Sequence, residues 1–193
     1  MRRTVDLLLS SAGLVIAIVL LALGGLLIWG QVFINDQVHD QLAAQKIFFP
    51  PKGSPAITGP QFAAMQKYAG QQLVTGAQAQ TYANHFIAVH LSEVAGGKTY
   101  SQVSVEALAN PNDATLKTQV ETLFRGTTLR GLLLNAYAFG QVAMIAGIAA
   151  VVCFVAAGAL LVLAALGFRH ASRRQAQAPV DMPRRAEEQA RAA

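Results

Sequence analysis

The stretch that decides the fold is residues 7–29, LLLSSAGLVIAIVLLALGGLLIW, which contains no charged side chain. A second uncharged stretch, AFGQVAMIAGIAAVVCFVAAGALLVLAALGF, occupies residues 138–168. A helix rises about 1.5 Å per residue, so each stretch is long enough to cross a hydrocarbon core of about 30 Å. In hydrocarbon every backbone N–H and C=O needs an internal partner, so each stretch is expected to be helical. The sequence therefore predicts two transmembrane helices.

The composition agrees with this interpretation. The 193-residue chain is 53% hydrophobic and only 13% charged, against about 25% charged residues in typical soluble domains. A cleaved signal peptide is the alternative for the first block, because two arginines precede it. The apolar core of a signal peptide is about 7–15 residues long and is followed by a small-residue cleavage site. The first block is longer and has no clear site of that kind, so we favour a retained anchor.

The basic residues beside the spans predict the orientation, since cytoplasmic flanks are enriched in Lys and Arg. Those residues are Arg2, Arg3, Arg169, Arg173 and Arg174. Trp29, at the other end of the first span, is expected to be an interfacial anchor. The region between the spans carries nearly equal numbers of basic and acidic side chains. We therefore expect a multi-pass protein of the plasma (inner) membrane, with both termini in the cytoplasm and the centre outside it.

The net charge of +5 is then a topology signal. Nucleic-acid binding is the other interpretation of a basic chain, but the excess lies beside the spans and no aromatic residues are interleaved with it. The expected partners are membrane lipids, including anionic lipids that contact the basic ends, and no nucleic acid.

The predicted fold class is an all-α membrane protein in which an extracytoplasmic helical bundle stands between two transmembrane helices. Its segments are a cytoplasmic N-terminus (1–6), a first transmembrane helix (7–30), an extracytoplasmic helical domain (31–130), a second transmembrane helix with an amphipathic outer entry (131–168) and a disordered cytoplasmic tail (169–193). The tail is rich in Ala, Gln, Arg and Glu and has almost no large apolar residue, which is typical of disorder.

Periodicity and breakers divide the central domain into helices. Apolar residues at helical spacing continue the first span outward until the proline-rich stretch 49–55 breaks it. Similar spacing predicts helices over 60–73 and 77–94, and Gly96 is expected to end the second. Thr99 and Gln102 form a T-x-x-Q capping box at the start of a short helix. After the breaker at 110–113, a last helix is expected to run into the second span.

Few residues in the centre are candidates for chemistry. His90 and Glu93 lie three apart on the apolar arc of the 77–94 helix, so their side chains are neighbours. They form either half a metal site, an acid–base pair or a buried polar pair, and we favour the buried pair because zinc needs three or four ligands. The other histidines between the spans are His39 and His85, and His85 falls on the polar edge of its helix. We predict no metal, no cofactor and no catalytic residues.

The spans themselves offer packing positions and no chemistry. Small residues stand four apart in each span, at Gly13 and Ala17 and at Ala143 and Gly147, a spacing that lets two helices approach closely. Proton relays and ion pathways usually need an ionisable residue within the membrane, and the two stretches have none. This argues against a self-contained pump or channel. The aromatic residues of the centre are expected in its core or at the interface, with a lipid-accepting groove as the alternative.

Several segments together resemble a group of uncharacterised actinobacterial membrane proteins with two spans. They are Thr4 to Trp29, Asp40 to Pro50, Gly97 to Ser101 and Leu123 to Leu134. Members of that group often carry an automatic label as aromatic ring-opening dioxygenases. Extradiol ring-opening enzymes need an iron held by histidines and a carboxylate in a soluble fold, and the set of such ligands here is too sparse. The resemblance implies an actinobacterial plasma membrane and an envelope context.

Three classes of function compete at this point. The one we favour is a non-enzymatic envelope protein, a structural or accessory subunit that assembles with itself or with a larger membrane complex. The second is a sensor- or receptor-like ectodomain that binds a small ligand or a lipid, although the tail after Phe168 has no output domain. The third, and the least favoured, is a metal-dependent enzyme.

Overall fold

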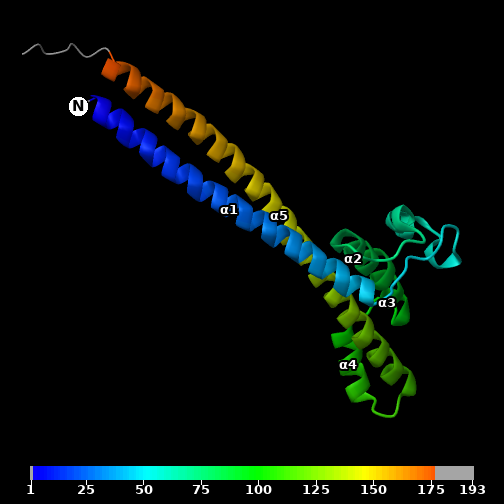
Figure 1. Cartoon of the computed structure of the whole chain (residues 1–193). Helices are drawn as coiled ribbons and strands as arrows, with labels where there is room; N and C mark the ends of the chain where they lie inside the picture. The colour runs from blue at the N-terminus through cyan, green and yellow to red at the C-terminus, as the bar shows by residue number, and fades with distance from the viewer. Residues whose placement is uncertain (1, 177–193) are drawn as a thin grey trace, which may run out of the picture. The chain divides into compact units, whose positions relative to one another are not determined.

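The computed structural model describes residues 2–176, and the regular elements of this part of the chain are all helices (Figure 1). Its elements are α1 (Arg2–Ala44), η1 (Pro55–Ile57), η2 (Pro60–Tyr68), α2 (Gly76–Tyr82), η3 (Ala83–Ile87), α3 (Ala88–Val94), α4 (Tyr100–Ala109) and α5 (Ala114–Ala176). Over these residues the only extended pairing is one antiparallel bridge between Phe48 and Gln72. The prediction of an all-α chain with two helices long and apolar enough to cross a membrane is confirmed.

The chain forms two compact units, which we call the helix-pair unit and the central unit. The helix-pair unit contains α1 as far as Leu26 and α5 from Ala149 onward, and the central unit is Leu27–Ile148. In the helix-pair unit the buried positions are small residues seven apart. They are Ser10, Ala17 and Gly24 on α1, and Ala150, Ala157, Ala164 and Ala171 on α5. A seven-residue repeat keeps one face of a helix against its neighbour, so the two segments pack along a seam.

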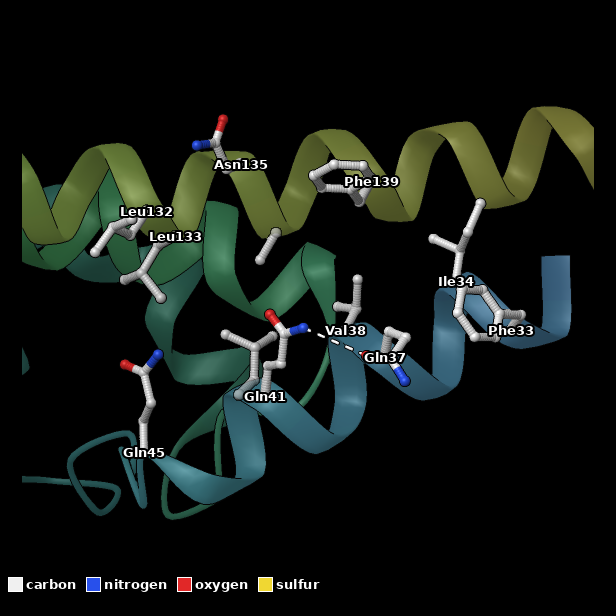
Figure 2. Close-up of a pocket in the computed structure, with 12 residues that line it drawn as sticks. Phe33, Ile34, Gln37, Val38, Gln41, Gln45, Leu132, Leu133, Asn135 and Phe139 are labelled. Atoms are coloured by element: carbon white, nitrogen blue, oxygen red, sulfur yellow. Dashed lines mark hydrogen bonds between the residues drawn. The ribbon is translucent and has the colours of Figure 1, made fainter. Parts of the chain in front are cut away.

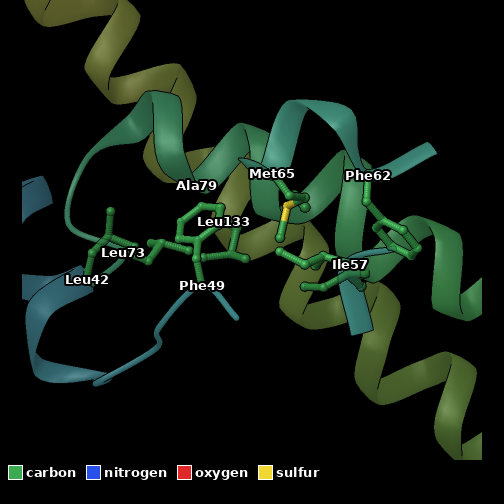
Figure 3. Close-up of a cluster of buried hydrophobic side chains, with 10 residues drawn as sticks. Leu42, Phe49, Ile57, Phe62, Met65, Leu73, Ala79 and Leu133 are labelled. Carbon is green, nitrogen blue, oxygen red and sulfur yellow. The ribbon is translucent and has the colours of Figure 1, made fainter. Parts of the chain in front are cut away.

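The core of the central unit gathers apolar side chains from four parts of the chain (Figure 3). They come from the end of α1, the 47–74 segment with its two 3₁₀ turns, α2 with η3, and α5. The buried members are Leu42, Phe49, Ile57, Phe62, Met65, Leu73, Ala79, Ala83, Ile87 and Leu133. Phe49 is among the most buried, and its ring lies 5.3 Å from the Tyr68 ring and 5.3 Å from the Tyr82 ring.

A second, smaller cluster joins α4 to the start of α5 through Ala95, Val103 and Leu123. Both helices begin at side-chain caps. Thr99 Oγ1 accepts from Gln102 N at 3.4 Å while Gln102 Oε1 accepts from Thr99 N at 2.9 Å, so the predicted capping box is present.

Three local expectations were wrong. Residues 60–73 do not form one helix: η2 is a 3₁₀ helix that ends at Tyr68, and Gly70 then adopts φ +74°, a conformation that glycine tolerates best. The three-residue spacing of Phe62 and Met65 fits a 3₁₀ turn better than an α-helix. The tail does not begin at residue 169, because α5 continues to Ala176. Residues 177–193 of the predicted tail lie outside the described residues.

The third difference lies inside the predicted 77–94 helix, which is continuous but contains a π turn at η3. The backbone N–H of Ala88 donates to the carbonyl of Ala83, five residues back. The helix begins one residue earlier than expected, at Gly76, where Thr75 and Gln78 form a second capping box. Gly76 also permits close packing, since a Cβ there would lie 3.0 Å from the Ala136 carbonyl oxygen of α5.

Candidate functional site

His90 and Glu93 do not form the buried pair that the sequence suggested. Glu93 is exposed, whereas His90 is half-buried between the rings of Phe62 and Phe86, at centroid distances of 5.7 and 4.4 Å. The His90 Nδ1–H donates to the Phe86 carbonyl at 2.8 Å, four residues back on the same helical stretch. A backbone acceptor therefore satisfies the imidazole, and the carboxylate of Glu93 faces water.

The other ionisable groups of the central unit meet in exposed pairs, such as Lys98 with Glu106 and Arg125 with Glu121. His39 is exposed and lies 3.2 Å from Asp40 Oδ1. Among residues 2–176 no three His, Cys, Asp or Glu side chains come together in a way that holds a metal ion. The π turn places Asn84 against α5, where its Oδ1 accepts from Arg130 at 2.9 Å. Burial beside the Phe49 ring raises the pKa of the Tyr82 hydroxyl above its ordinary value of 10.0.

Three of the four small residues predicted to pack are buried, and at the fourth, Gly13, a Cβ would meet no other segment within 4 Å. Ala17 and Ala143 are fully buried, and Gly147 is buried too. A Cβ at Gly147 would lie 2.6 Å from the Gln31 side chain, so that glycine makes room for a polar residue of α1 within the central unit. Gly13 is half-buried.

The long helices expose most of their apolar side chains. In the most apolar 18-residue stretch of each helix, only 11% of the α1 residues and 17% of the α5 residues are buried. Leu9, Ile18 and Val155, for example, are 68%, 56% and 68% exposed. The core helix of a soluble protein buries such side chains, so this surface needs a cover other than water.

Three of the residues predicted as membrane anchors have described side chains. Trp29 is 64% exposed, and its ring stacks on Phe33 at 5.6 Å. Arg169 and Arg173 are exposed on the last turns of α5. The side chains of Arg2, Arg3 and Arg174 lie outside the described ones.

One groove in the central unit has the size and lining of a ligand site. It lies between the end of α1 and the facing part of α5 and has a volume of about 480 Å³ (Figure 2), within the range of about 300–1,000 Å³ typical of small-molecule pockets. We call it the α1–α5 groove. Its lining residues are Phe33, Ile34, Gln37, Val38, Gln41 and Leu42 from α1, Gln45 from the turn after it, and Leu132, Leu133, Asn135, Ala136 and Phe139 from α5.

Sequence reasoning missed this groove. The aromatic residues considered for a lipid groove are distributed otherwise, with Phe49 and Phe62 buried in the core and Phe48 exposed. The sequence pattern that could have indicated the groove is a polar stripe, because Gln37, Gln41 and Gln45 stand four residues apart and so share one face. This stripe lines a groove only where it faces α5, whose lining residues lie about ninety residues further along the chain.

No protein-family model, curated protein or solved structure matches this chain. We therefore infer the function from the geometry of the two units.

Proposed function

We propose that this chain is an integral membrane protein that crosses the bilayer twice, with its central unit outside the cytoplasm. The carrying observation is the apolar surface of α1 and α5, which is long enough to span and remains exposed. Lipid would cover that surface, since burial of apolar area is worth about 25 cal/mol per Å². The orientation rests on the arginines at both ends of the chain. The resemblance to actinobacterial two-span proteins agrees with this location.

Within the membrane we propose that the protein acts as a non-enzymatic accessory subunit, in a homo-oligomer or a larger complex. A second exposed apolar surface supports the proposal of a protein partner. It lies on α4, outside the apolar stretches of α1 and α5 that lipid would cover. There Val105 is 65% and Leu108 82% exposed, three residues apart on one helical face. This exposed apolar pair on a folded unit is the contact that we propose for the partner.

Purification in mild detergent, with identification of co-purifying subunits, tests the accessory role. The wild-type chain should bring down further copies or other subunits in stoichiometric amounts. Leu108→Lys should release them, whereas Asn112→Lys, in the exposed loop before α5, should retain them. Recovery of the wild-type chain as a monomer without partners would contradict the proposal. Extraction of the chain from membranes by alkaline carbonate would contradict the membrane location itself.

A second candidate function is ligand binding by a receptor-like ectodomain, and the α1–α5 groove favours it. This function is compatible with an accessory role, because a bound ligand can bias how α1 and α5 present the central unit to a partner.

A further inference from the structure

The α1–α5 groove is lined without a single charged side chain. All twelve residues that Figure 2 draws are apolar or carry an amide. The exposed charges beside it along the chain have both signs, since Asp36 and Asp40 alternate with the groove-lining glutamines and Lys46 directly follows Gln45. Neither an anionic nor a cationic headgroup would find an oppositely charged side chain in the lining. Charge complementarity therefore favours an uncharged ligand.

The polar part of the groove is a ladder of amides along the end of α1 and the turn that follows it. Gln37, Gln41 and Gln45 follow one another at single-turn spacing, and Gln41 Nε2 donates to Gln37 Oε1 at 3.5 Å. That contact is at the upper limit of a hydrogen bond, so both amides keep donor and acceptor capacity. Amides donate and accept at once, which suits hydroxyl groups and ester carbonyls. In Figure 2 the Gln41 amide points from α1 toward α5, whereas Asn135 points away from α1.

The other part of the groove is apolar. Val38, Leu42 and Leu133 form its floor and are buried or half-buried. At the end nearest the first span, Phe33 and Phe139 are 51% and 58% exposed. Water that filled this volume would lie against walls that are mostly apolar. An apolar chain removes that unfavourable contact.

The apolar end of the groove continues into surface that lipid would cover. Phe33 stacks on Trp29, which is 64% exposed, and Phe139 is followed one turn later by Val142, which is 52% exposed. A lipid that enters from the bilayer side therefore meets exposed apolar side chains of both helices at this end of the groove. The amide ladder lies further along α1, at the end that is distant from the span.

We propose that the α1–α5 groove binds one uncharged amphiphile of the diacylglycerol class. An acyl chain lies between Phe33 and Phe139 over the Val38–Leu133 floor, and the hydroxyl and ester groups bond to Gln41 and Gln45. This assignment rests on the proposed membrane location, and it gives the receptor-like candidate function a ligand class.

Photo-crosslinking of the full chain in phosphatidylcholine vesicles tests the assignment. The probe is a diacylglycerol with a diazirine in one acyl chain, and labelled peptides are mapped by mass spectrometry. Label should concentrate in residues 33–45 and 132–139. Excess dioleoylglycerol should compete, and dioleoylphosphatidylglycerol should not.

Two matched pairs of variants locate the site. Ala136→Trp fills the groove, whereas Ala138→Trp adds the same side chain to an exposed position of α5 outside the lining. We expect the first to lower labelling about tenfold, equivalent to about 1.4 kcal/mol of binding free energy, and the second to leave it unchanged. Gln41→Glu, which adds a charge at an exposed position and so should not disturb folding, should also lower labelling, and Asn35→Asp should not.

Equal labelling of Ala136→Trp and Ala138→Trp, or label spread evenly over α1 and α5, would overturn the assignment. Equal competition by the anionic lipid would overturn the choice of an uncharged ligand. Complete disulfide cross-linking between two Gln41→Cys chains that also carry Cys153→Ala would place a second copy in the groove and overturn the lipid. If the chain resists carbonate extraction and keeps its subunits while the groove remains unlabelled, this inference fails and the proposed function stands.

Discussion

Phe48 and Phe49 are adjacent phenylalanines with opposite environments. The same substitution at each position removes the same side chain, so the difference between the two variants measures the contribution of core packing. Phe49 is 2% exposed and Phe48 is 56% exposed. We expect Phe49→Ala to destabilise the central unit strongly and Phe48→Ala to have a small effect.

The magnitude follows from what the Phe49 ring contacts. It packs between the rings of Tyr68 and Tyr82, each 5.3 Å away, and the ring plane of Tyr82 is perpendicular to its own. Truncation of a buried phenylalanine to alanine costs about 3–5 kcal/mol, which includes the cavity left behind, and lost aromatic pairs place this site in the upper half of that range. For a chain of this size such a loss lowers Tm by about 10 °C. Surface truncations are usually within about 0.5 kcal/mol.

The assay should report the central unit and not the helix pair. The single tryptophan, Trp29, lies on α1 beside the first span, so its fluorescence is a poor probe of this core. Pulse proteolysis of the full chain in mild detergent, with cleavage sites mapped to residues 45–100, measures the relevant opening. Equal destabilisation by Phe48→Ala and Phe49→Ala, or a Phe49→Ala effect below about 1 kcal/mol, would refute the packing described here.

Three further outcomes are expected. Gly24→Leu should destabilise the helix-pair unit by about 1–3 kcal/mol, because a Cβ at Gly24 would lie 2.9 Å from the Phe154 ring. Gly25→Leu should not, because Gly25 has open space around it. Steric-trap unfolding in detergent measures the effect of both variants. Thr99→Ala should weaken α4 by about 1 kcal/mol through loss of its cap, seen as faster hydrogen exchange of the α4 amides. The pKa of Tyr82 is raised, so above about pH 10 the unfolded state loses a proton that the folded state keeps. The free energy of unfolding should therefore fall as pH rises, by up to about 1.4 kcal/mol per pH unit. In a pH series of denaturant melts, Tyr82→Phe should remove this contribution to the slope.

Much of the fold was predictable because its signals are local. An uncharged stretch longer than a bilayer is thick specifies a helix by itself, and residues 7–29 and 138–168 lie in α1 and α5. The capping box of Thr99 and Gln102 spans three residues, so its pattern was visible in the sequence. The break at 110–113 was visible for the same reason.

The remaining features depend on contacts between distant segments. The amphipathic pattern of residues 77–94 is the same with or without a π turn, and the contact that accompanies that turn, Asn84 with Arg130, joins residues far apart in the chain. His90 and Glu93 are neighbours on a helical wheel, but Phe62 from η2 covers only the histidine. The α1–α5 groove likewise exists only once two distant helices are placed together.

The most direct test of the central claim is the accessibility of single cysteines in intact cells that express the chain. With Cys153 replaced by alanine, a cysteine is introduced at Asn112 or at Ala176, on opposite sides of the second span. A membrane-impermeant maleimide should label Asn112→Cys in intact cells and Ala176→Cys only after the cells are lysed. Labelling of Ala176→Cys from outside, or protection of Asn112→Cys until lysis, would contradict a twice-spanning chain whose central unit lies outside the cytoplasm.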